Sequence, residues 1–391
     1  MKKRVLAIIL AVVIAAALLP VGTASASDIT LIIDGVRQNP TVPPRVVNGV
    51  TLVPLRLISE TLGAVVQWDG TARTATIETA AYTVVFTVNS NTYTVNGASR
   101  RLDQPAQLVA GATMVPIRAF AESIGADVNY NSGTNTATIN YFTTMSGTVR
   151  ISGSTTVQPI VQAAADRIRS RNSELSIVVS GGGSGTGINE ATAGTVNIGM
   201  SSRDLREEEL RALNIYRVAY DAIAIIVHPS NPVTNLTMDQ AKRIFMGEIS
   251  NWSEVGGNNA PILVQTRETG SGTLSVLQDL LLGSGNAVVD RATAHASAAL
   301  IKNAVARDAN AIGFDSIGFV DNTVKALSLD GVAATAQTVN NNTYALSRSL
   351  WVCTRGRVQP GPSAVFIDYL RSLEVQRDIV QREGYIRIPT S

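Results

Sequence analysis

An internal repeat most restricts how the first third of this chain can fold. The segment Val53-Pro54-Leu55-Arg56 recurs 62 residues later as Val115-Pro116-Ile117-Arg118. At the same spacing, Leu62-Gly63-Ala64 recurs as Ile124-Gly125-Ala126, and Thr74-Ala75-Thr76-Ile77 as Thr136-Ala137-Thr138-Ile139. Self-similarity of this kind indicates a duplicated supersecondary unit. We therefore expect two copies of one small unit, over about residues 30–79 and 92–141.

Each copy carries the signals of a mixed α+β unit. A hairpin is expected first, because the dipeptides Asp34-Gly35 and Asn96-Gly97 favour tight β-turns. A helix should follow from Pro54 or Pro116 and end near the next glycine, since proline suits the first turn of a helix and glycine its end. Two strands of alternating polarity close each copy.

This pattern resembles the copper amine oxidase N-terminal domain, which recurs as a stalk on exported proteins. The resemblance covers about residues 29–141 and rests on V-P-[LI]-R, L-G-A and the T-A-T-I ending. It implies an accessory module within residues 27–141. Copper chemistry does not follow from it, because the segment has no His, Cys or Met cluster to bind copper. For Arg56 and Arg118 we expect a solvated or capping role at the helix starts.

The chain begins with the pattern of a secretory signal peptide. Lys2, Lys3 and Arg4 precede an apolar run over residues 5–19, and Ala24-Ser25-Ala26 is a typical cleavage site. Residues 1–26 are therefore predicted to be a signal peptide, with an uncleaved anchor as the alternative. The protein is expected outside the cytoplasm, secreted, at the cell surface or in the periplasm.

Composition excludes several classes of function. The single cysteine, Cys353, allows no internal disulfide framework, no cysteine-built metal site and no lipid anchor after the signal peptide. A net charge of +2 gives no global field that would attract nucleic acid. With 45% hydrophobic and 16% charged residues, the chain can bury real cores. No cofactor or metal is expected.

After an uncharged linker near residues 141–147, strands alternate with helices to the end of the chain. Strands are expected over 148–152, 176–180, 196–200 and 222–228, and helices over 157–168, 206–213, 238–246, 274–282, 297–305 and 364–381. This alternation predicts α/β layers with mainly parallel sheets. We expect residues 147–391 to fold separately from the repeat, because each part has its own apolar periodicity.

Three loops combine glycine with hydroxyl residues, and each lies between an expected strand and an expected helix. They span residues 152–156, 180–187 and 267–273. Free backbone N–H groups and the helix dipole make such a position suitable for an anion. None of the loops matches the P-loop or the dinucleotide fingerprint. Arg267 is the one fixed cation in them, so the pattern predicts a small oxyanion held by neutral donors and one guanidinium.

These loops also resemble the phosphate-binding proteins of phosphate ABC transporters. The resemblance spans about residues 147–388 and rests on G-S-T-T-V-Q-P, G-G-S-G-T-G, I-G-M-S-S-R, I-F-M-G and R-x-x-x-S-G-T, in that order. It implies a type II periplasmic-binding fold with two α/β lobes and a ligand cleft. Lobe 1 would comprise about 147–228 and 346–391, and lobe 2 about 229–345, with crossovers near 226–228 and 345–351.

Carried over by motif, the resemblance implies a set of phosphate-binding residues. They are Ser154, Thr155, Ser184, Ser202, Arg267, Ser271, Gly272 and Thr273. Well-known members have an aspartate at the position of Ser202, where it accepts the proton of hydrogen phosphate and repels sulfate. Asp221 is our first candidate for that acceptor here, and Asp204 and Glu268 are further candidates. Arg203 is expected to form a surface ion pair.

The sequence therefore predicts capture of inorganic phosphate outside the membrane and its delivery to the permease of an ABC transporter, without catalysis. Two alternatives stay open. One is another tetrahedral anion such as sulfate, and the other is a surface-attached sensing protein whose N-terminal repeat contacts the cell wall. A hydrolase is disfavoured, because His228 and His295 lie outside the three loops.

Overall fold

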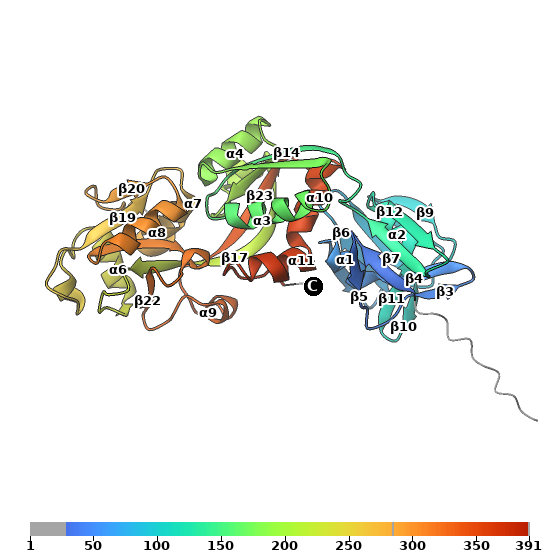
Figure 1. Ribbon diagram of the computed structural model, residues 1–391, viewed down its shortest axis with the longest axis horizontal. Coiled ribbons are helices and arrows are strands. Elements are labelled where there is room, and N and C mark those ends of the chain that lie inside the picture. The colour runs from blue at the N-terminus through green and yellow to red at the C-terminus, as the bar shows by residue number, and fades with distance from the viewer. Residues whose placement is uncertain (1–28, 284, 390–391) are drawn as a thin grey trace, which may run out of the picture.

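The computed structural model describes residues 29–283 and 285–389, which form three parts in a row (Figure 1). The repeat forms one end, a first lobe lies in the middle, and a second lobe forms the other end. The expected signal peptide lies outside the described residues. Within them, no helix has the length and apolar character needed to cross a bilayer.

The N-terminal module has two copies of one set of elements, as the repeat predicts. The first copy comprises β1 (Thr30–Ile33), β2 (Val36–Gln38), β3 (Arg45–Val47), β4 (Val50–Pro54), α1 (Leu55–Thr61), β5 (Val65–Asp69) and β6 (Thr74–Glu78). After β7 (Thr83–Thr87), the second comprises β8 (Thr92–Val95), β9 (Ala98–Arg101), β10 (Gln107–Val109), β11 (Ala112–Pro116), α2 (Ile117–Ser123), β12 (Asp127–Asn131) and β13 (Thr136–Asn140). Each element of the first copy therefore reappears 62 residues later.

The two copies are joined through their sheets. Val53 of β4 pairs with its own counterpart, Val115 of β11, at the centre of the sheet β10-β11-β4-β3. Strand β1 of the first copy pairs in parallel with β13 of the second. Both helices begin directly after their proline, and Gly63 and Gly125 beyond their ends have φ of +84° and +82°, which favours glycine.

The rest of the chain is the expected α/β structure with two lobes. The first lobe contains β14 (Gly147–Gly153), α3 (Gln158–Arg169), β15 (Leu175–Ser180), α4 (Ser184–Ala193), β16 (Ile198–Ser201), α5 (Glu207–Leu210), β23 (Ser347–Arg355), α10 (Pro362–Arg371) and α11 (Leu373–Val375). The second contains β18 (Asn235–Leu236), α6 (Met238–Phe245), β19 (Leu263–Arg267), α7 (Gly272–Leu277), β20 (Thr293–His295), α8 (Ala298–Arg307), β21 (Ala311–Ser316), β22 (Lys325–Leu329) and α9 (Ala336–Asn340).

Two long strands connect the lobes. Strand β17 (Leu213–Val227) pairs with β23 of the first lobe up to Ala222, and with β21 of the second lobe from Ile223 onward. The first crossover is therefore a few residues earlier than the expected 226–228, because the strand begins at Leu213, well before its apolar run, and changes partner at the start of that run. The second crossover falls at Leu346 and Ser347, inside the expected range: Leu346 is buried in the core of the second lobe, and Ser347 begins β23.

The expected linker does not separate two independent cores. One continuous core contains Leu31 and Phe120 of the module together with Ile160 and Phe366 of the first lobe. Asn172 of the first lobe donates from Nδ2 to the carbonyl oxygens of Phe142 and Met145, each at 2.7 Å, and so fixes the linker. Separate folding of the two parts stays a prediction, but the structure packs them together.

A buried carboxylate fastens the module to the first lobe. Asp368 of α10 is fully buried and accepts hydrogen bonds from the backbone N–H of Ala80 and the hydroxyl of Tyr141, both at 2.7 Å. Gly63 lies directly against the carbonyl of Asp368, where any side chain would clash. The amphipathic pattern of α10 gives no sign of this contact, since an aspartate in a helix is normally solvated.

We expect Asp368→Ala to lower the free energy of unfolding by about 2–5 kcal/mol, because it leaves two buried donors without an acceptor. Denaturant unfolding of the full chain measures this loss. Asp127→Ala, at an exposed position of β12, is the control and should change stability by less than about 0.5 kcal/mol. Equal stability of the two variants would show that the contact contributes little.

Candidate functional site

The three glycine–hydroxyl loops meet where the two lobes face each other. The first loop joins β14 to α3 and the second joins β15 to α4, both in the first lobe. The third joins β19 to α7 in the second lobe. Gly185 donates its backbone N–H to the carbonyl oxygen of Gly270 at 3.0 Å, and the hydroxyls of Thr156 and Thr273 lie 3.1 Å apart. The lobes are therefore closed on one another at these loops.

Arg267 lies at the centre of this junction. Its side chain is 3% exposed, and it ends β19 at the edge that faces the first lobe. Nε donates to the carbonyl oxygen of His295, and Nη2 donates to the carbonyl oxygen of Ala296 and to Thr155 Oγ1 of the other lobe, each at 3.1 Å. All of these acceptors are neutral, and Arg267 forms no ion pair within residues 29–283 and 285–389.

A buried guanidinium without a counter-ion is unfavourable. Burial lowers the pKa of Arg267, and the nearby charge of Arg348 acts in the same direction, while Asp315 partly opposes them. An anion bound beside Arg267 would supply the missing charge. The geometry of the junction thus favours a negatively charged ligand.

The serine hydroxyls of the three loops are oriented by backbone groups. Ser154 Oγ accepts from the N–H of Thr156 and Val157, and Ser184 Oγ accepts from the N–H of Ser202. Ser271 Oγ, at the N-cap of α7, accepts from the N–H of Leu274. A hydroxyl that accepts a backbone bond keeps its own proton for another acceptor. These side chains can therefore act as the neutral donors that the sequence predicts.

Gly272 lets the lobes approach closely. A Cβ at this position would lie 2.8 Å from Ser202 Oγ and still closer to Ser184 Oγ, both in the other lobe. Gly187 has a different role, because a Cβ there would press into the backbone of β14, 2.6 Å from the oxygen of Ser152. The glycines of the loops thus divide between closure of the site and packing of α4 on its sheet.

Asp221, the first candidate for the proton acceptor, is buried but engaged. Its Oδ1 accepts from Ser316 Oγ at 2.7 Å, and its Oδ2 accepts from Arg348 Nε at 2.9 Å. Arg348 also donates from Nη1 to the carbonyl oxygen of Ser202 at 3.1 Å and to Thr273 Oγ1 at 2.9 Å. Asp221 therefore orients an arginine that contacts residues of both lobes.

The other two candidates are not buried at the junction. Asp204 accepts from the indole N–H of Trp351 near the surface, and Glu268 is exposed. Arg203 forms an ion pair, as expected, but with Glu209 at 2.7 Å and not with Asp204 or Glu207; the two side chains are only 11% and 16% exposed, so the pair is not the expected surface contact. The histidines are also engaged elsewhere: His228 contacts Ser230, and the ring of His295 contacts Gln265.

Sequence reasoning missed two charged residues of the site, Arg348 and Asp315. Arg348 follows the second crossover and has no glycine or hydroxyl motif around it. Asp315 is the last residue but one of β21, and it is 1% exposed with no hydrogen-bond partner for Oδ2. Burial raises the pKa of Asp315 to about 8. An aspartate at the carboxyl end of a buried strand was the available signal for Asp315.

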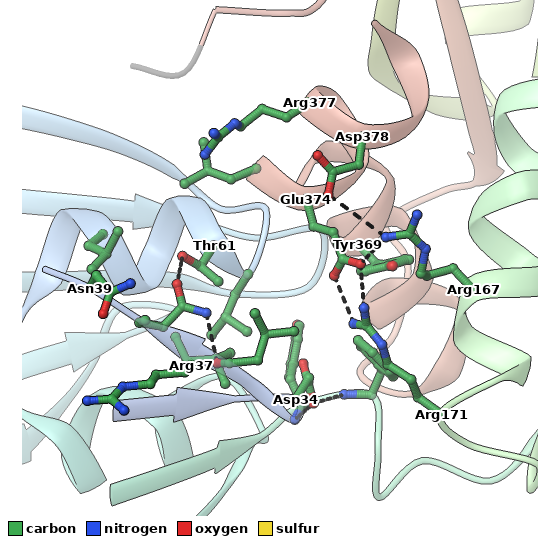
Figure 2. A pocket seen from close by; sticks show the side chains of 18 residues that line it. Asp34, Arg37, Asn39, Thr61, Arg167, Arg171, Tyr369, Glu374, Arg377 and Asp378 are labelled. Carbon is green, nitrogen blue, oxygen red and sulfur yellow. Dashed lines mark hydrogen bonds and ion pairs between the residues drawn. The ribbon is translucent and has the colours of Figure 1, made fainter. Parts of the chain in front are cut away.

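A separate cavity of about 490 Å³ lies between the module and the first lobe (Figure 2). Its wall contains Arg167 and Arg171, which both bind Glu374 of α11 at 2.6 Å. The size would suit a small molecule. Arg167 and Arg171 already have a carboxylate partner, and Arg37 and Arg377, which also line the cavity, are exposed, so none of the four is a buried unpaired cation like Arg267. Cys353 is buried, and burial raises the pKa of its thiol to about 12, as expected for a core cysteine.

Family models match both parts of the chain. Residues 142–373 match the PBP superfamily domain, and residues 32–139 match the copper amine oxidase N-terminal domain. No group of three or more His, Cys, Asp or Glu side chains among the described residues is placed to hold a metal ion.

Relatives of the second part are named for phosphate. Over 247 residues the chain is 34% identical to phosphate-binding protein PstS of Bacillus subtilis, covering 62% of this chain and 81% of that one. It is 32% identical over 253 residues to PstS of Borreliella burgdorferi, covering 62% and 90%.

Solved structures agree with these relatives. The chain is 39% identical to a phosphate ABC transporter substrate-binding protein of Clostridium perfringens with bound phosphate, with a TM-score of 0.59, covering 62% of this chain and 100% of that one. For an ABC-type phosphate transport receptor of Vibrio cholerae the identity is 35% and the TM-score 0.53, with the same coverage. The chain belongs to the family of phosphate ABC transporter substrate-binding proteins, with a copper amine oxidase N-terminal domain in front.

Proposed function

We propose that this protein captures inorganic phosphate outside the cytoplasm and delivers it to the permease of an ABC transporter. The observation that supports this most is Arg267, a buried cation without a carboxylate partner among the described residues. Thr155 of the first lobe accepts from it, and the hydroxyls of Thr156 and Thr273 meet across the same junction, so neutral donors from both lobes are available to an anion there. The names of the relatives favour phosphate as that anion.

In this proposal the ligand drives closure of the lobes. Ser154, Thr155 and Ser184 would donate to the anion from the first lobe, and Arg267 and Thr273 from the second. Phosphate bridging the two sets binds the closed form better than the open one, so it shifts the equilibrium toward closure. The permease would then distinguish the loaded from the empty protein by shape. No covalent bond is broken, so no catalytic residue is needed.

Arg267→Ala should weaken phosphate binding by at least a hundredfold, because a charge-assisted contact in a buried site is lost. Isothermal titration calorimetry of the mature protein with phosphate measures the change. Arg243→Ala, which removes a half-exposed arginine paired with Glu248, is the control and should bind like wild type. Undiminished affinity in folded Arg267→Ala would contradict the site.

Gly272→Ala tests closure without removing a charge. The added methyl group would meet Ser184 and Ser202 only when the lobes close, so we expect phosphate affinity to fall by tenfold or more. Gly185→Ala is the matched control, since its methyl group would lie 3.5 Å from Gly270, an ordinary contact. Small-angle scattering with and without phosphate should show closure in the control and not in Gly272→Ala. Equal affinities would argue against this closed geometry.

A surface-attached role is a second candidate, supported by the module. Trp68 and its repeat counterpart Tyr130 are both exposed, at 42% and 41%, and so are the counterparts Val46 and Leu108. Trp68 and Leu108 line a groove of about 520 Å³. Duplicated aromatic side chains at the surface suit a repeating ligand such as a cell-wall glycan.

We expect the double variant Trp68→Ala/Tyr130→Ala to lose sedimentation with purified cell walls and to bind phosphate like wild type. The control is Leu300→Ala, which changes an exposed apolar residue of the second lobe. Phe142 lies closer to the module but is buried, so it would be an unsuitable control. If wild-type protein does not sediment with walls, the surface-attached role fails.

A further inference from the structure

Asp315 has no role in the site as described so far, although it is the most unusual carboxyl group at the junction. It is fully buried, and its Oδ1 accepts the N–H of Ser316 while Oδ2 has no partner. A buried polar atom without a partner costs free energy, and such atoms are rare in native proteins. Oδ2 of Asp315 would therefore be stabilised by a proton, or by a ligand that donates a hydrogen bond to it.

Asp315 lies beside Arg267 at the same edge of the sheet. Strands β19 and β21 are parallel, with Leu263 opposite Ala311 and Val264 opposite Ile312. Continuing this register to the strand ends sets Arg267 next to Asp315. Two residues earlier on each strand, a Cβ on Gly313 would lie 3.5 Å from Gln265 Cβ, so these two positions are side by side. Because residues two apart on a strand point to the same face, the side chains of Arg267 and Asp315 also share a face of the sheet.

The two groups are close without forming an ion pair. The charges of Arg267 and Arg348 act to lower the pKa of Asp315, yet Asp315 forms no ion pair in the described part of the chain. A buried carboxylate and a buried guanidinium on adjacent strands would normally pair. A single group that accepts from Arg267 and donates to Oδ2 of Asp315 would satisfy both side chains. Hydrogen phosphate is such a group, since it carries both acceptor oxygens and a hydroxyl.

We propose that Asp315 selects the protonation state of the bound anion, with its free Oδ2 sharing one proton with a phosphate hydroxyl. This inference rests on the proposed binding of phosphate. Asp221 is less suited to the task, because each of its oxygens already accepts from a partner, Ser316 or Arg348, whereas Oδ2 of Asp315 accepts from none. Asp315, on the second lobe, would then supply the carboxylate that other family members have at the position of Ser202 in the first lobe.

The proton balance differs between phosphate and sulfate. When Asp315 is ionised, hydrogen phosphate brings the shared proton itself, and the complex forms without proton uptake. Sulfate has no proton, so it must either face the ionised carboxylate or take up one proton from solvent to bind. When Asp315 is protonated, its O–H can donate to either anion. Selectivity for phosphate over sulfate is therefore expected to rise with pH.

The other titratable and charged groups around Asp315 are Arg267, Arg348, Asp221 and Tyr385, with His295 behind Arg267. The arginines stay charged at all accessible pH values. Burial holds the pKa of Tyr385 well above its usual range, and burial with Arg267 holds that of His295 below its usual range. Asp315, with a pKa of about 8, is thus the group expected to titrate between about pH 7 and 9.

Calorimetry of the full mature chain tests this without a variant. At about pH 9, in two buffers of different ionisation enthalpy, phosphate binding should take up no proton and sulfate binding about one. Above pH 8 the sulfate affinity should fall by about tenfold per pH unit, and the phosphate affinity by much less. Equal proton uptake for the two anions would overturn the assignment.

Asp315→Asn supplies the second arm, because the amide donates at every pH. It should raise sulfate affinity at pH 9 by at least tenfold over wild type and make the phosphate-to-sulfate ratio independent of pH. Asp221→Asn is the matched control. It should weaken the binding of phosphate and sulfate by similar factors, so that the ratio of the two affinities still depends on pH. If Asp315→Asn does not fold, the proton counts of wild type decide.

The two proposals fail in different ways. If wild type binds no phosphate at any pH, the proposed function falls. If wild type binds phosphate but Asp315→Asn keeps the pH-dependent ratio, or still excludes sulfate, phosphate capture stands and the role of Asp315 falls.

Discussion

The arrangement of the two lobes depends on one buried positive charge. Arg267 ends a strand of the second lobe, and its guanidinium reaches across to Thr155 of the first. Its acceptors are carbonyl and hydroxyl oxygens, which orient the group without neutralising it. Desolvating such a charge is costly unless something compensates it. In the proposed function, closure and anion binding are therefore coupled: the closed form buries the cation, and a bound anion would offset the cost.

Arg348 contributes a second cation, whose charge is already balanced. Its ion pair with Asp221 at 2.7 Å lies within the strand pair β17–β23, which is also the connection between the lobes. Because the pair is 3% and 0% exposed, it is part of the fold rather than a surface contact. Through Ser202 and Thr273 the same arginine contacts both lobes. Arg348 thus stabilises the connection between the lobes, and Arg267, in the proposed function, keeps its charge for the ligand.

The sequence predicts elements that depend on local patterns. The 62-residue repeat, the helices after Pro54 and Pro116, the two-lobed α/β fold and the positions of the three loops are all confirmed. The loops are predictable because a helix N-terminus with glycine and serine has the same chemistry in any fold. The roles of single residues within the loops stay predictions.

Contacts between distant segments were not predictable in the same way. Arg348 and Asp221 meet only because β17 and β23 pair across 127 residues of sequence. Asp315 reaches the site through the register of β21 with β19. Asp368 looks like a surface residue of a helix, yet a segment 288 residues away supplies its donor. Each of these charged residues takes its role from a tertiary neighbour that no local pattern specifies.

The attachment of the module determines which lobe is free to move. The core that joins the module to the first lobe includes residues from Ile29 to Tyr385, and the separate core of the second lobe contains no residue before Ala222. Asp368 and the fixed linker further bind the module to the first lobe. Movement about the crossovers in β17 and β23 can therefore carry the second lobe, with Arg267 and Asp315, while the module and the first lobe stay together. Whatever the module contacts would then remain in place as the cleft opens and closes.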